Sequence, residues 1–392
     1  MSISNIVKQQ ITQGSWIRRM FEEGIRLKAK HGTDSVCDLT LGNPYLDPPP
    51  EFMKALRKVV KDEKPGVHVY MQNSGYPETR DRVAGRLRTD FDLPFTRDHV
   101  VMTVGAAGAL NVILKSIVEP DDEVILVSPY FCEYGFYICN HQGKKVVSPA
   151  TRDFLPDLED LERRITSRTR AVIINSPNNP TGRLIPADTL ESLGNLLRAR
   201  SEDIGHIIYL ISDEPYRRLL FDGLEYVSPL KYYDDTLVAM SHSKDLSLAG
   251  ERIGYLAISP KCRHAADLFD AAIFLNRTLG YINAPALMQR MLAEIEAIRP
   301  DVRVYQAKRD MLYGALKDMG YDVLKPEGTF YMFPRSPLPD DLDFIKVLQD
   351  RLVLVSPGSG FECPGFFRIS FCVDDRVIER SLPRFEDAMK SV

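Results

Sequence analysis

The stretch HVVMTVGAAGALNVILKSI, residues 99–117, joins a short apolar run to a longer helical pattern. Residues 99–104 are rich in β-branched side chains, which favours a strand. Residues 106–117 place their apolar side chains on one face of a helix. Two glycines and two alanines between the runs, at 105–108, indicate a tight turn into the helix. The stretch therefore predicts one strand–helix unit of an α/β fold.

The same alternation continues along the chain. Strands are predicted over residues 123–129, 144–149, 170–177, 206–215, 236–244 and 252–260, with helical patterns between most of them. Strands this apolar are covered on both faces, and a repeated strand–helix order indicates a mainly parallel sheet. We therefore expect an α/β fold with a large domain, residues 45–295, whose mainly parallel sheet carries helices on both faces.

The character of the sequence changes after Pro300. Residues 304–320 have a helical pattern, residues 328–334 and 367–373 have strand patterns, and residues 375–392 are helical with a break predicted at Pro383. The segment 16–30 is amphipathic and needs a partner surface. We expect residues 1–44 and 296–392 to build a smaller α+β domain from both ends of the chain.

The composition argues against several classes of protein. The 392 residues carry a net charge of -4, which gives no reason to expect a nucleic-acid partner. No segment approaches the ~20 apolar residues of a membrane span, and the first residues lack the apolar core of a signal peptide. Six irregularly spaced cysteines and seven scattered histidines indicate neither a disulfide framework nor a zinc site. We expect a cytoplasmic protein without a metal that acts on small molecules.

Small and polar residues lie at or just after the ends of four of the predicted strands. Ligands of an open parallel sheet bind beyond the carboxyl ends of its strands, so these residues are candidates for a single site. They are Gly105, Ala106 and Ala107; Asn179 in SPNNPTG; Asp213 and Tyr216 in SDEPY; and Ser241, Ser243 and Lys244 in SHSK, followed by Arg252. Each residue alone is explained by a turn, a helix cap or a surface charge. Only their combination at one sheet edge indicates a ligand.

The combined groups fit pyridoxal phosphate, which carries a phosphate, a protonatable ring nitrogen, a phenolic oxygen and an aldehyde. A buried carboxylate needs a cationic partner, and Asp213 would keep the ring nitrogen protonated. Lys244 would attach covalently to the aldehyde, with nearby cations lowering its pKa. Asn179 and Tyr216 would bind the ring oxygen. The phosphate would be held by Ser241, Arg252 and the backbone N–H groups of residues 105–107, with Ser243 as a further cofactor-binding residue.

Four motifs of the chain resemble those of the class I/II aminotransferases, the aspartate aminotransferase-like pyridoxal-phosphate enzymes of fold type I. They are SPNNPTG (176–182), SDEPY (212–216), SHSKDLSLAGERIGY (241–255) and FRIS (367–370), and the resemblance spans roughly residues 35–390. It implies that Phe131 stacks on the cofactor ring, that Arg368 binds the substrate α-carboxylate, and that Gly42 lies near the substrate. It also implies a homodimer in which Tyr70 reaches the cofactor phosphate of the neighbouring subunit.

Two positions depart from the family pattern. Glu251 stands where many members carry an aromatic residue before the phosphate-binding arginine, and its role is unexplained. Ala106 and Ala107 stand where some relatives place a polar or cationic side chain. Phosphate binding would therefore depend more on backbone N–H groups and Arg252.

The resemblance implies an enzyme that moves an amino group from an L-amino acid to a 2-oxo acid by a ping-pong mechanism. Aspartate with 2-oxoglutarate is the first substrate hypothesis, and Arg18, Arg19, Arg277 and Arg335 are candidates for binding a distal carboxylate. Aromatic, branched or methionine-like donors stay open, since Tyr45 and residues 16–21 could line an apolar pocket. A carbon–sulfur β-lyase, which uses the same lysine and aspartate, is the alternative reaction.

Overall fold

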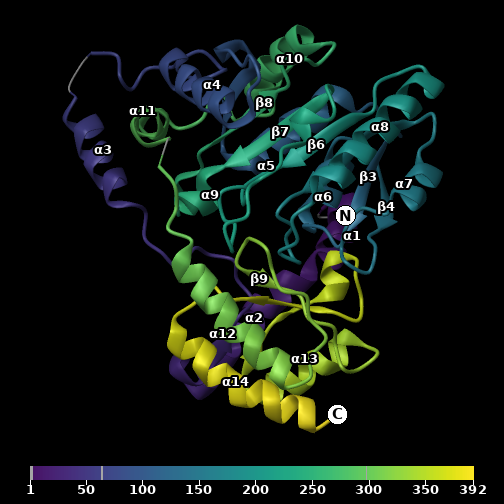
Figure 1. The fold of residues 1–392 in the computed structure, drawn as a ribbon. Coiled ribbons are helices and arrows are strands. Elements are labelled where there is room, and N and C mark those ends of the chain that lie inside the picture. Colours follow the sequence, from purple (N-terminus) through teal and green to yellow (C-terminus); the bar gives the residue numbers. More distant parts are fainter. Residues whose placement is uncertain (1–2, 63–64, 297) are drawn as a thin grey trace.

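The computed structural model describes residues 3–62, 65–296 and 298–392, without the side chains of residues 12–13 and 15–21. The chain forms a larger and a smaller unit, which are the upper and lower halves of Figure 1. Within the described part of the chain, no helix combines the length and the apolar character needed to cross a membrane.

The larger unit is built on a seven-stranded sheet with the strand order β2–β8–β7–β6–β5–β3–β4. Its strands are β2 (Val100–Thr103), β3 (Glu123–Ser128), β4 (Lys144–Pro149), β5 (Thr169–Asn175), β6 (Tyr209–Asp213), β7 (Thr236–Ser241) and β8 (Gly254–Ile258). β8 runs antiparallel to both of its neighbours, and the other neighbouring pairs are parallel. The prediction of a mainly parallel sheet is confirmed.

Helices cover both faces of this sheet. One face packs against α5 (Gly105–Ile117), α6 (Glu133–Asn140) and α10 (Ala265–Thr278), with Ile173 and Ile211 in the shared core. The adjacent strand residues Val172 and Leu210 pack on the opposite face, beneath α7 (Leu158–Arg164) and α8 (Ala187–Ile204). α3 (Pro50–Lys61), α4 (Pro77–Phe91) and α11 (Ala286–Ile295) pack near β2, β7 and β8. Because successive strand residues face opposite ways, double burial explains the nearly continuous apolar runs.

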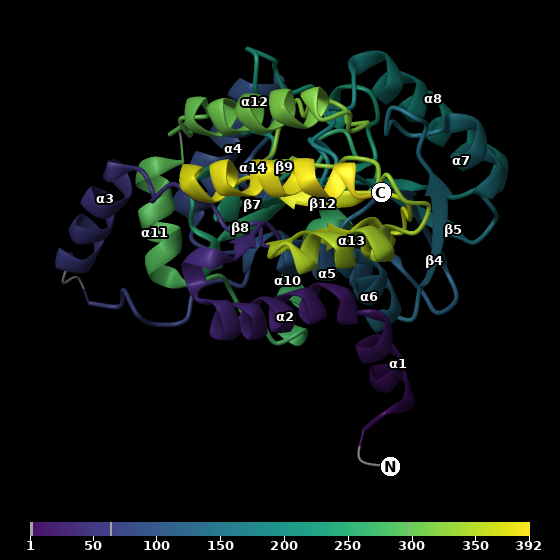
Figure 2. The same ribbon diagram turned by 90° about the horizontal axis from the view of Figure 1, so that it is seen from below.

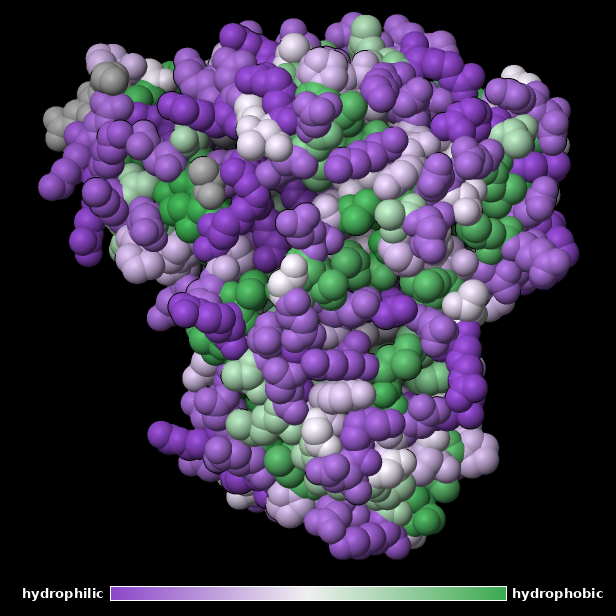
Figure 3. Space-filling view, viewed as in Figure 1, coloured by the Kyte–Doolittle hydropathy of each residue, from purple (hydrophilic) through white to green (hydrophobic). Residues whose placement is uncertain are grey.

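The smaller unit joins both ends of the chain. Its helices are α2 (Ser15–His31), α12 (Arg303–Asp318), α13 (Asp341–Asp350) and α14 (Asp375–Lys390); α12, α14 and α13 lie side by side in Figure 2. β11 (Ser356–Pro357), β12 (Phe367–Ser370) and β9 (Tyr331–Met332) form an antiparallel sheet, while β1 (Cys37–Asp38) pairs in parallel with β10 (Val353–Leu354). The outline narrows between the two units, and hydrophilic side chains cover most of the face shown in Figure 3.

The first helix, α1 (Asn5–Gln13), contacts the larger unit instead. The Gln10 side chain donates a hydrogen bond to the Asn140 side chain at the end of α6, with a donor–acceptor distance of 3.4 Å. The boundaries proposed for the two domains, after residues 44 and 295, stay a prediction.

Several local predictions were wrong. The strand predicted over residues 236–244 ends at Ser241, because residues 242–245 form a helical turn. α14 runs through Pro383 without a break, because residues on both sides of the proline, including Ile378 and Phe385, are buried in the core of the smaller unit. The strand predicted over residues 328–334 is limited to Tyr331–Met332, since Thr329 has a φ of +66° and interrupts the extended backbone.

The register of the large sheet brings the ends of its central strands together. Asn175, the last residue of β5, pairs with Asp213, the last residue of β6. Asp213 pairs in turn with Ala239 of β7, two residues before that strand ends at Ser241. Three segments that are distant in the sequence therefore leave the sheet at one edge, in the place where the sequence predicts a ligand site.

Candidate active site

A cavity of about 420 Å³ lies at this edge of the sheet, between the two units. All the predicted site residues except Gly105 and Tyr70 line it: Gly42, Ala106, Ala107, Phe131, Asn179, Asp213, Tyr216, Ser241, Ser243, Lys244, Arg252 and Arg368. Gly105 adjoins the lining, since a Cβ there would lie 3.2 Å from the Ser241 hydroxyl oxygen. Tyr70 is outside the cavity of its own chain, with 88% of its surface exposed.

Lys244 lies in α9 (His242–Asp245), a single helical turn that directly follows β7. Ser241 caps this turn, since its hydroxyl accepts a hydrogen bond from the Ser243 backbone N–H at 3.2 Å. The Lys244 ammonium donates to the carbonyl oxygen of Gly42 at 2.5 Å and lies 5.6 Å from the centre of the Phe330 ring. The turn therefore directs the amine into the cavity.

Burial lowers the pKa of Lys244 to about 8, because the charged form loses its hydration. Cys372 acts in the opposite direction, and the positive charges of Arg368 and Arg252 lower the pKa further. An amine with this pKa is partly unprotonated near neutral pH, so it is available as a nucleophile or a base.

Asp213 brings a buried carboxylate to the same cavity. One of its oxygens accepts a hydrogen bond from the Tyr134 hydroxyl at 2.5 Å, whereas Oδ1 has no partner among the described residues. Burial raises the pKa of Asp213 to about 7, an effect that the Tyr134 bond opposes and the nearby Glu214 reinforces. A buried oxygen without a donor costs free energy, which a protonated nitrogen of a ligand would recover.

The start of α5 and the residues around Arg252 form a cradle for an anion. The hydroxyls of Ser241 and Ser243 lie 2.7 Å apart, and Arg252 Nη1 donates to Ser243 Oγ at 3.3 Å. Gly105 has a φ of +77°, and a Cβ there would lie 3.0 Å from Arg252 Nη2. Its missing side chain leaves room for the guanidinium beside the first N–H groups of α5. Hydroxyls, a guanidinium and a helix N-terminus together suit a phosphate.

Arg368 extends from β12 into the cavity lining, where it contacts Asn179. Its Nη1 donates to Asn179 Oδ1 at 3.0 Å, and its Nη2 donates to the Thr40 carbonyl at 2.6 Å. The guanidinium lies over the rings of Tyr331 and Phe361, 4.4 and 4.8 Å from their centres. A guanidinium fixed by two rings and two hydrogen bonds presents a planar fork of donors that matches a carboxylate.

Tyr331 and Tyr134 belong to the site but were not predicted from the sequence. The Tyr331 hydroxyl lies 3.1 Å from the Tyr216 hydroxyl, and both rings are buried. A Cβ on Gly42 would lie 1.8 Å from the Tyr331 hydroxyl, so only glycine lets residues 40–43 approach this closely. In the sequence, the only signal for a site role of Tyr331 was its polar hydroxyl within the short apolar strand pattern of residues 328–334.

The residues suggested for a substrate side chain lie elsewhere or outside the described part. Arg277 packs on the Phe274 ring, Arg335 packs on the Phe366 ring, and neither lines the cavity. Tyr45 also does not line it, and its hydroxyl lies 3.5 Å from Asp374. The side chains of residues 16–21, which include Arg18 and Arg19, are not among those described.

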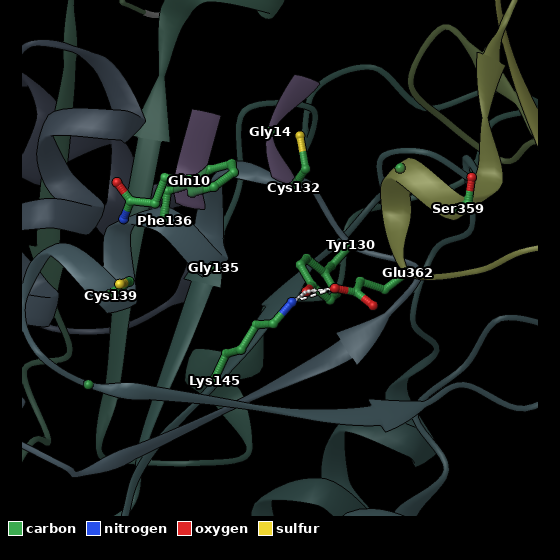
Figure 4. Close-up of a pocket in the computed structure, with 12 residues that line it drawn as sticks. Gln10, Gly14, Tyr130, Cys132, Gly135, Phe136, Cys139, Lys145, Ser359 and Glu362 are labelled. Atoms are coloured by element: carbon green, nitrogen blue, oxygen red, sulfur yellow. Dashed lines mark hydrogen bonds and ion pairs between the residues drawn. The ribbon is translucent and has the colours of Figure 1, made fainter. Parts of the chain in front are cut away.

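Figure 4 shows a second cavity, of about 510 Å³. Tyr130 and Cys132 line it, whereas Phe131 between them lines the first cavity. Lys145 forms an ion pair with Glu362 there and donates to the Tyr130 hydroxyl at 3.2 Å (Figure 4). The segment 130–132 therefore separates the two cavities and is tied to the smaller unit.

Comparison with known proteins agrees with this geometry. The sequence model of the class I and II aminotransferases matches residues 34–385. A probable aspartate aminotransferase from Methanocaldococcus jannaschii is 31% identical over 360 residues, which cover 89% of this chain and 92% of the relative. The aspartate/prephenate aminotransferase from Thermus thermophilus is 32% identical over 367 residues, which cover 91% of each chain.

Solved structures give the same result. An aminotransferase from Eubacterium rectale superposes with a TM-score of 0.96 at 38% identity, and the match covers 100% of this chain and 99% of that one. The aspartate aminotransferase from Thermus thermophilus, solved with maleate, superposes with a TM-score of 0.85 at 28% identity, covering 95% and 96% of the two chains. The chain therefore belongs to the class I and II aminotransferases, enzymes that transfer amino groups between amino acids and 2-oxo acids.

Proposed function

We propose that this aminotransferase works with pyridoxal 5′-phosphate bound in the 420 Å³ cavity. The observation that carries the proposal is the presence, in one cavity, of a lysine whose pKa is lowered to about 8 and a buried carboxylate oxygen without a donor. When bound, the cofactor supplies an aldehyde for amino groups and a pyridinium ring that accepts electrons from the substrate Cα.

Each polar group of the cofactor would find a partner among the residues of the cavity. Asp213 Oδ1 would accept a hydrogen bond from the protonated ring nitrogen, whose positive charge would counter the burial that raises the pKa of Asp213. Tyr216 and Asn179 would bind the ring oxygen, and Phe131 would stack on the ring. The phosphate would bind Ser241, Ser243, Arg252 and the N–H groups of residues 105–107.

Lys244 and Arg368 would then act on the substrate. Lys244 would hold the cofactor at rest and, once its amine is released, would take the proton from the substrate Cα. In the second half of the ping-pong cycle it would return a proton to the Cα of the product amino acid. Arg368 would grip the α-carboxylate through two N–H bonds, which fixes the Cα in reach of the Lys244 amine.

We propose aspartate and 2-oxoglutarate as the substrates, supported by the names of the relatives above. Among the described side chains that line the cavity, the cations are Lys244, Arg252 and Arg368, and each has a role already. A partner for a distal carboxylate would therefore come from Arg18 or Arg19, or from a second subunit. Aromatic donors are the second candidate, because the lining includes Leu41 and Tyr331 and an aromatic-amino-acid aminotransferase from Thermococcus litoralis is 27% identical.

We further propose a cytoplasmic homodimer with shared active sites. Tyr70 and Val69 have 88% and 63% of their surfaces exposed, an apolar area that a second copy would cover. Tyr70 would reach the cofactor phosphate of the partner subunit. The six free cysteines support a reducing compartment.

Amino-donor screening tests the reaction and its substrates. With bound cofactor, the enzyme should convert aspartate and 2-oxoglutarate to oxaloacetate and glutamate, and a coupled assay measures this rate. The kcat/KM for aspartate should exceed the values for tyrosine, phenylalanine, leucine and methionine as amino donors. An absorbance change of the cofactor with aromatic donors, and none with aspartate, would show that the amino donors are aromatic amino acids. Release of pyruvate from cystathionine without any 2-oxo acid would instead support a β-lyase, and no response to any donor would contradict transamination.

The assignment of Lys244 is tested by borohydride reduction followed by peptide mapping. The cofactor should be fixed on Lys244, and the rate of attachment should rise with pH with a midpoint near 8, since only the unprotonated amine attacks the aldehyde. Lys145→Met, which removes a lysine from the second cavity, is the control and should leave labelling unchanged. A labelled peptide from another part of the chain would refute the assignment.

Replacing Asp213 tests its partnership with the ring nitrogen. Asp213→Asn keeps the shape of the side chain but not its charge, so the cofactor should still attach while kcat falls by about 10²-fold or more. Glu251→Gln, an exposed change beside Arg252, serves as the control and should alter kcat by less than about twofold. A fully active Asp213→Asn variant would mean that the ring nitrogen has another partner.

If two subunits share each active site, the protein should sediment as a dimer in analytical ultracentrifugation. Tyr70 should then contact the cofactor phosphate of the partner subunit. Tyr70→Phe should leave the dimer intact and weaken cofactor binding by about tenfold, the loss of one hydrogen bond to a charged group. A monomer, or a variant with unchanged cofactor affinity, would exclude this role for Tyr70.

A further inference from the structure

A cluster of charged side chains is buried next to the cavity without lining it. The side chains of Glu214, Arg217, Arg218, Asp245 and Glu296 are each at most 4% exposed. Ion pairs that are this deeply buried add little net stability, because desolvation of the charges cancels most of their attraction. Their presence beside the reactive residues calls for another explanation.

Two short segments divide their side chains between the cavity and this cluster. Residues 213–218 place Asp213, Pro215 and Tyr216 on the cavity, and Glu214, Arg217 and Arg218 in the cluster. In α9, Ser243 and Lys244 line the cavity, whereas His242 and Asp245 are buried away from it. Each segment therefore has one face for the ligand and another that anchors it.

One guanidinium connects the two segments. Arg218 Nη1 donates to Asp245 Oδ2 at 3.1 Å, and Arg218 Nη2 donates to Glu296 Oε1 at 2.5 Å. Asp245 also lies 3.2 Å from His242 Nδ1. Burial would raise the pKa of Asp245, but the charges of His242 and Arg218 outweigh it and keep the pKa below its usual value. Asp245 is therefore ionised, and its pair with Arg218 is a charged hydrogen bond.

From this arrangement we propose that the Arg218–Asp245 pair positions Lys244 relative to Asp213 and Tyr216. α9 has only four residues, so it has almost no stability of its own as a helix. Asp245 is the residue after Lys244, and Arg218 is the second residue after Tyr216. Tying Asp245 to Arg218 therefore fixes the direction of the lysine side chain against the segment that carries the other reactive groups. The inference deepens the proposed role of Lys244 and rests on it.

The pair acts through geometry and not through its charge. The influences on the pKa of Lys244 are burial, then Cys372, Arg368 and Arg252, and none of these belongs to the buried cluster. Losing the charge of Asp245 should therefore change the direction of the Lys244 amine within the cavity, where it stays buried, so its pKa should stay near 8. A purely structural role, or an electrostatic one, would not give this combination.

Asp245→Asn and Glu296→Gln each remove one carboxylate charge from the same guanidinium, and only Asp245 adjoins Lys244. Asp245→Asn also alters the contact with His242, which belongs to the same helical turn as Lys244. Both should lower the melting temperature to a similar extent. Asp245→Asn should also slow cofactor attachment to Lys244 and lower kcat, each by about 10- to 100-fold, since small misplacements of a reacting group cost this much. Glu296→Gln should change both rates by less than about twofold, and the pH midpoint of attachment should stay near 8 in both variants.

Arg218→Lys provides a second test that keeps a cation in the cluster if Asp245→Asn does not fold. Lysine cannot bridge two carboxylates in the planar geometry of arginine, so attachment should slow again with an unchanged pH midpoint. Equal losses in Asp245→Asn and Glu296→Gln at matched folded fractions would overturn the proposal, as would normal attachment in Arg218→Lys or a shifted midpoint. Failure of the unsubstituted protein to attach the cofactor at Lys244 would instead contradict the proposed function.

Discussion

Desolvation of Lys244 and Asp213 is the constraint on which the remainder of the site depends. Burial disfavours the charged form of each group, so it lowers the pKa of the lysine to about 8 and raises that of the carboxyl to about 7. Both groups line a cavity to which both units contribute side chains. Residues 40–43, Tyr331 and Arg368 of the smaller unit complete the walls of the cavity. The proposed chemistry therefore depends on side chains from both units.

The same constraint explains why reactive segments are anchored from behind. A segment at the edge of a sheet has few backbone hydrogen bonds to fix it, and α9 is only one turn long. Apolar packing would stabilise such a segment without fixing its direction, whereas a guanidinium that meets carboxylates accepts only a narrow range of geometries. A buried pair of small net stability can therefore be kept for the orientation that it imposes on Lys244.

Patterns that are local in the sequence were sufficient to predict the sheet and the convergence of its strand ends. Apolar runs such as 170–177 indicate strands covered on both faces, and the parallel order then places Asn179, Asp213 and Lys244 at one edge. Phe131, Gly42 and Arg368 came from the resemblance, because no pattern in their own segments marks them. Their positions in the cavity agree with the resemblance, while their roles stay proposals.

Contacts between residues that are distant in the sequence cannot be predicted from local patterns of this kind. Tyr134 meets Asp213 across 79 positions, and Tyr331 meets Tyr216 across 115, so neither pairing has a local signal. At Pro383 the local signal was present but misleading, since burial of one helix face on both sides of the proline outweighs the missing hydrogen bond. Tertiary packing decided each of these positions.

The backbone of residues 40–42 explains how the cations of the site can prefer a ligand carboxylate over the carbonyl groups that they contact in this structure. The Thr40 carbonyl accepts from Arg368 at 2.6 Å, and the Gly42 carbonyl accepts from Lys244 at 2.5 Å. Both acceptors are neutral, whereas a substrate carboxylate is charged and can meet the guanidinium with two parallel bonds. Exchange of the carbonyl for the carboxylate is therefore favourable at Arg368, and the absence of a side chain at Gly42 lets the segment stay beside Tyr331. In the proposed role of Arg368, a preference for a carboxylate then follows from the difference between a neutral and a charged acceptor of one cation.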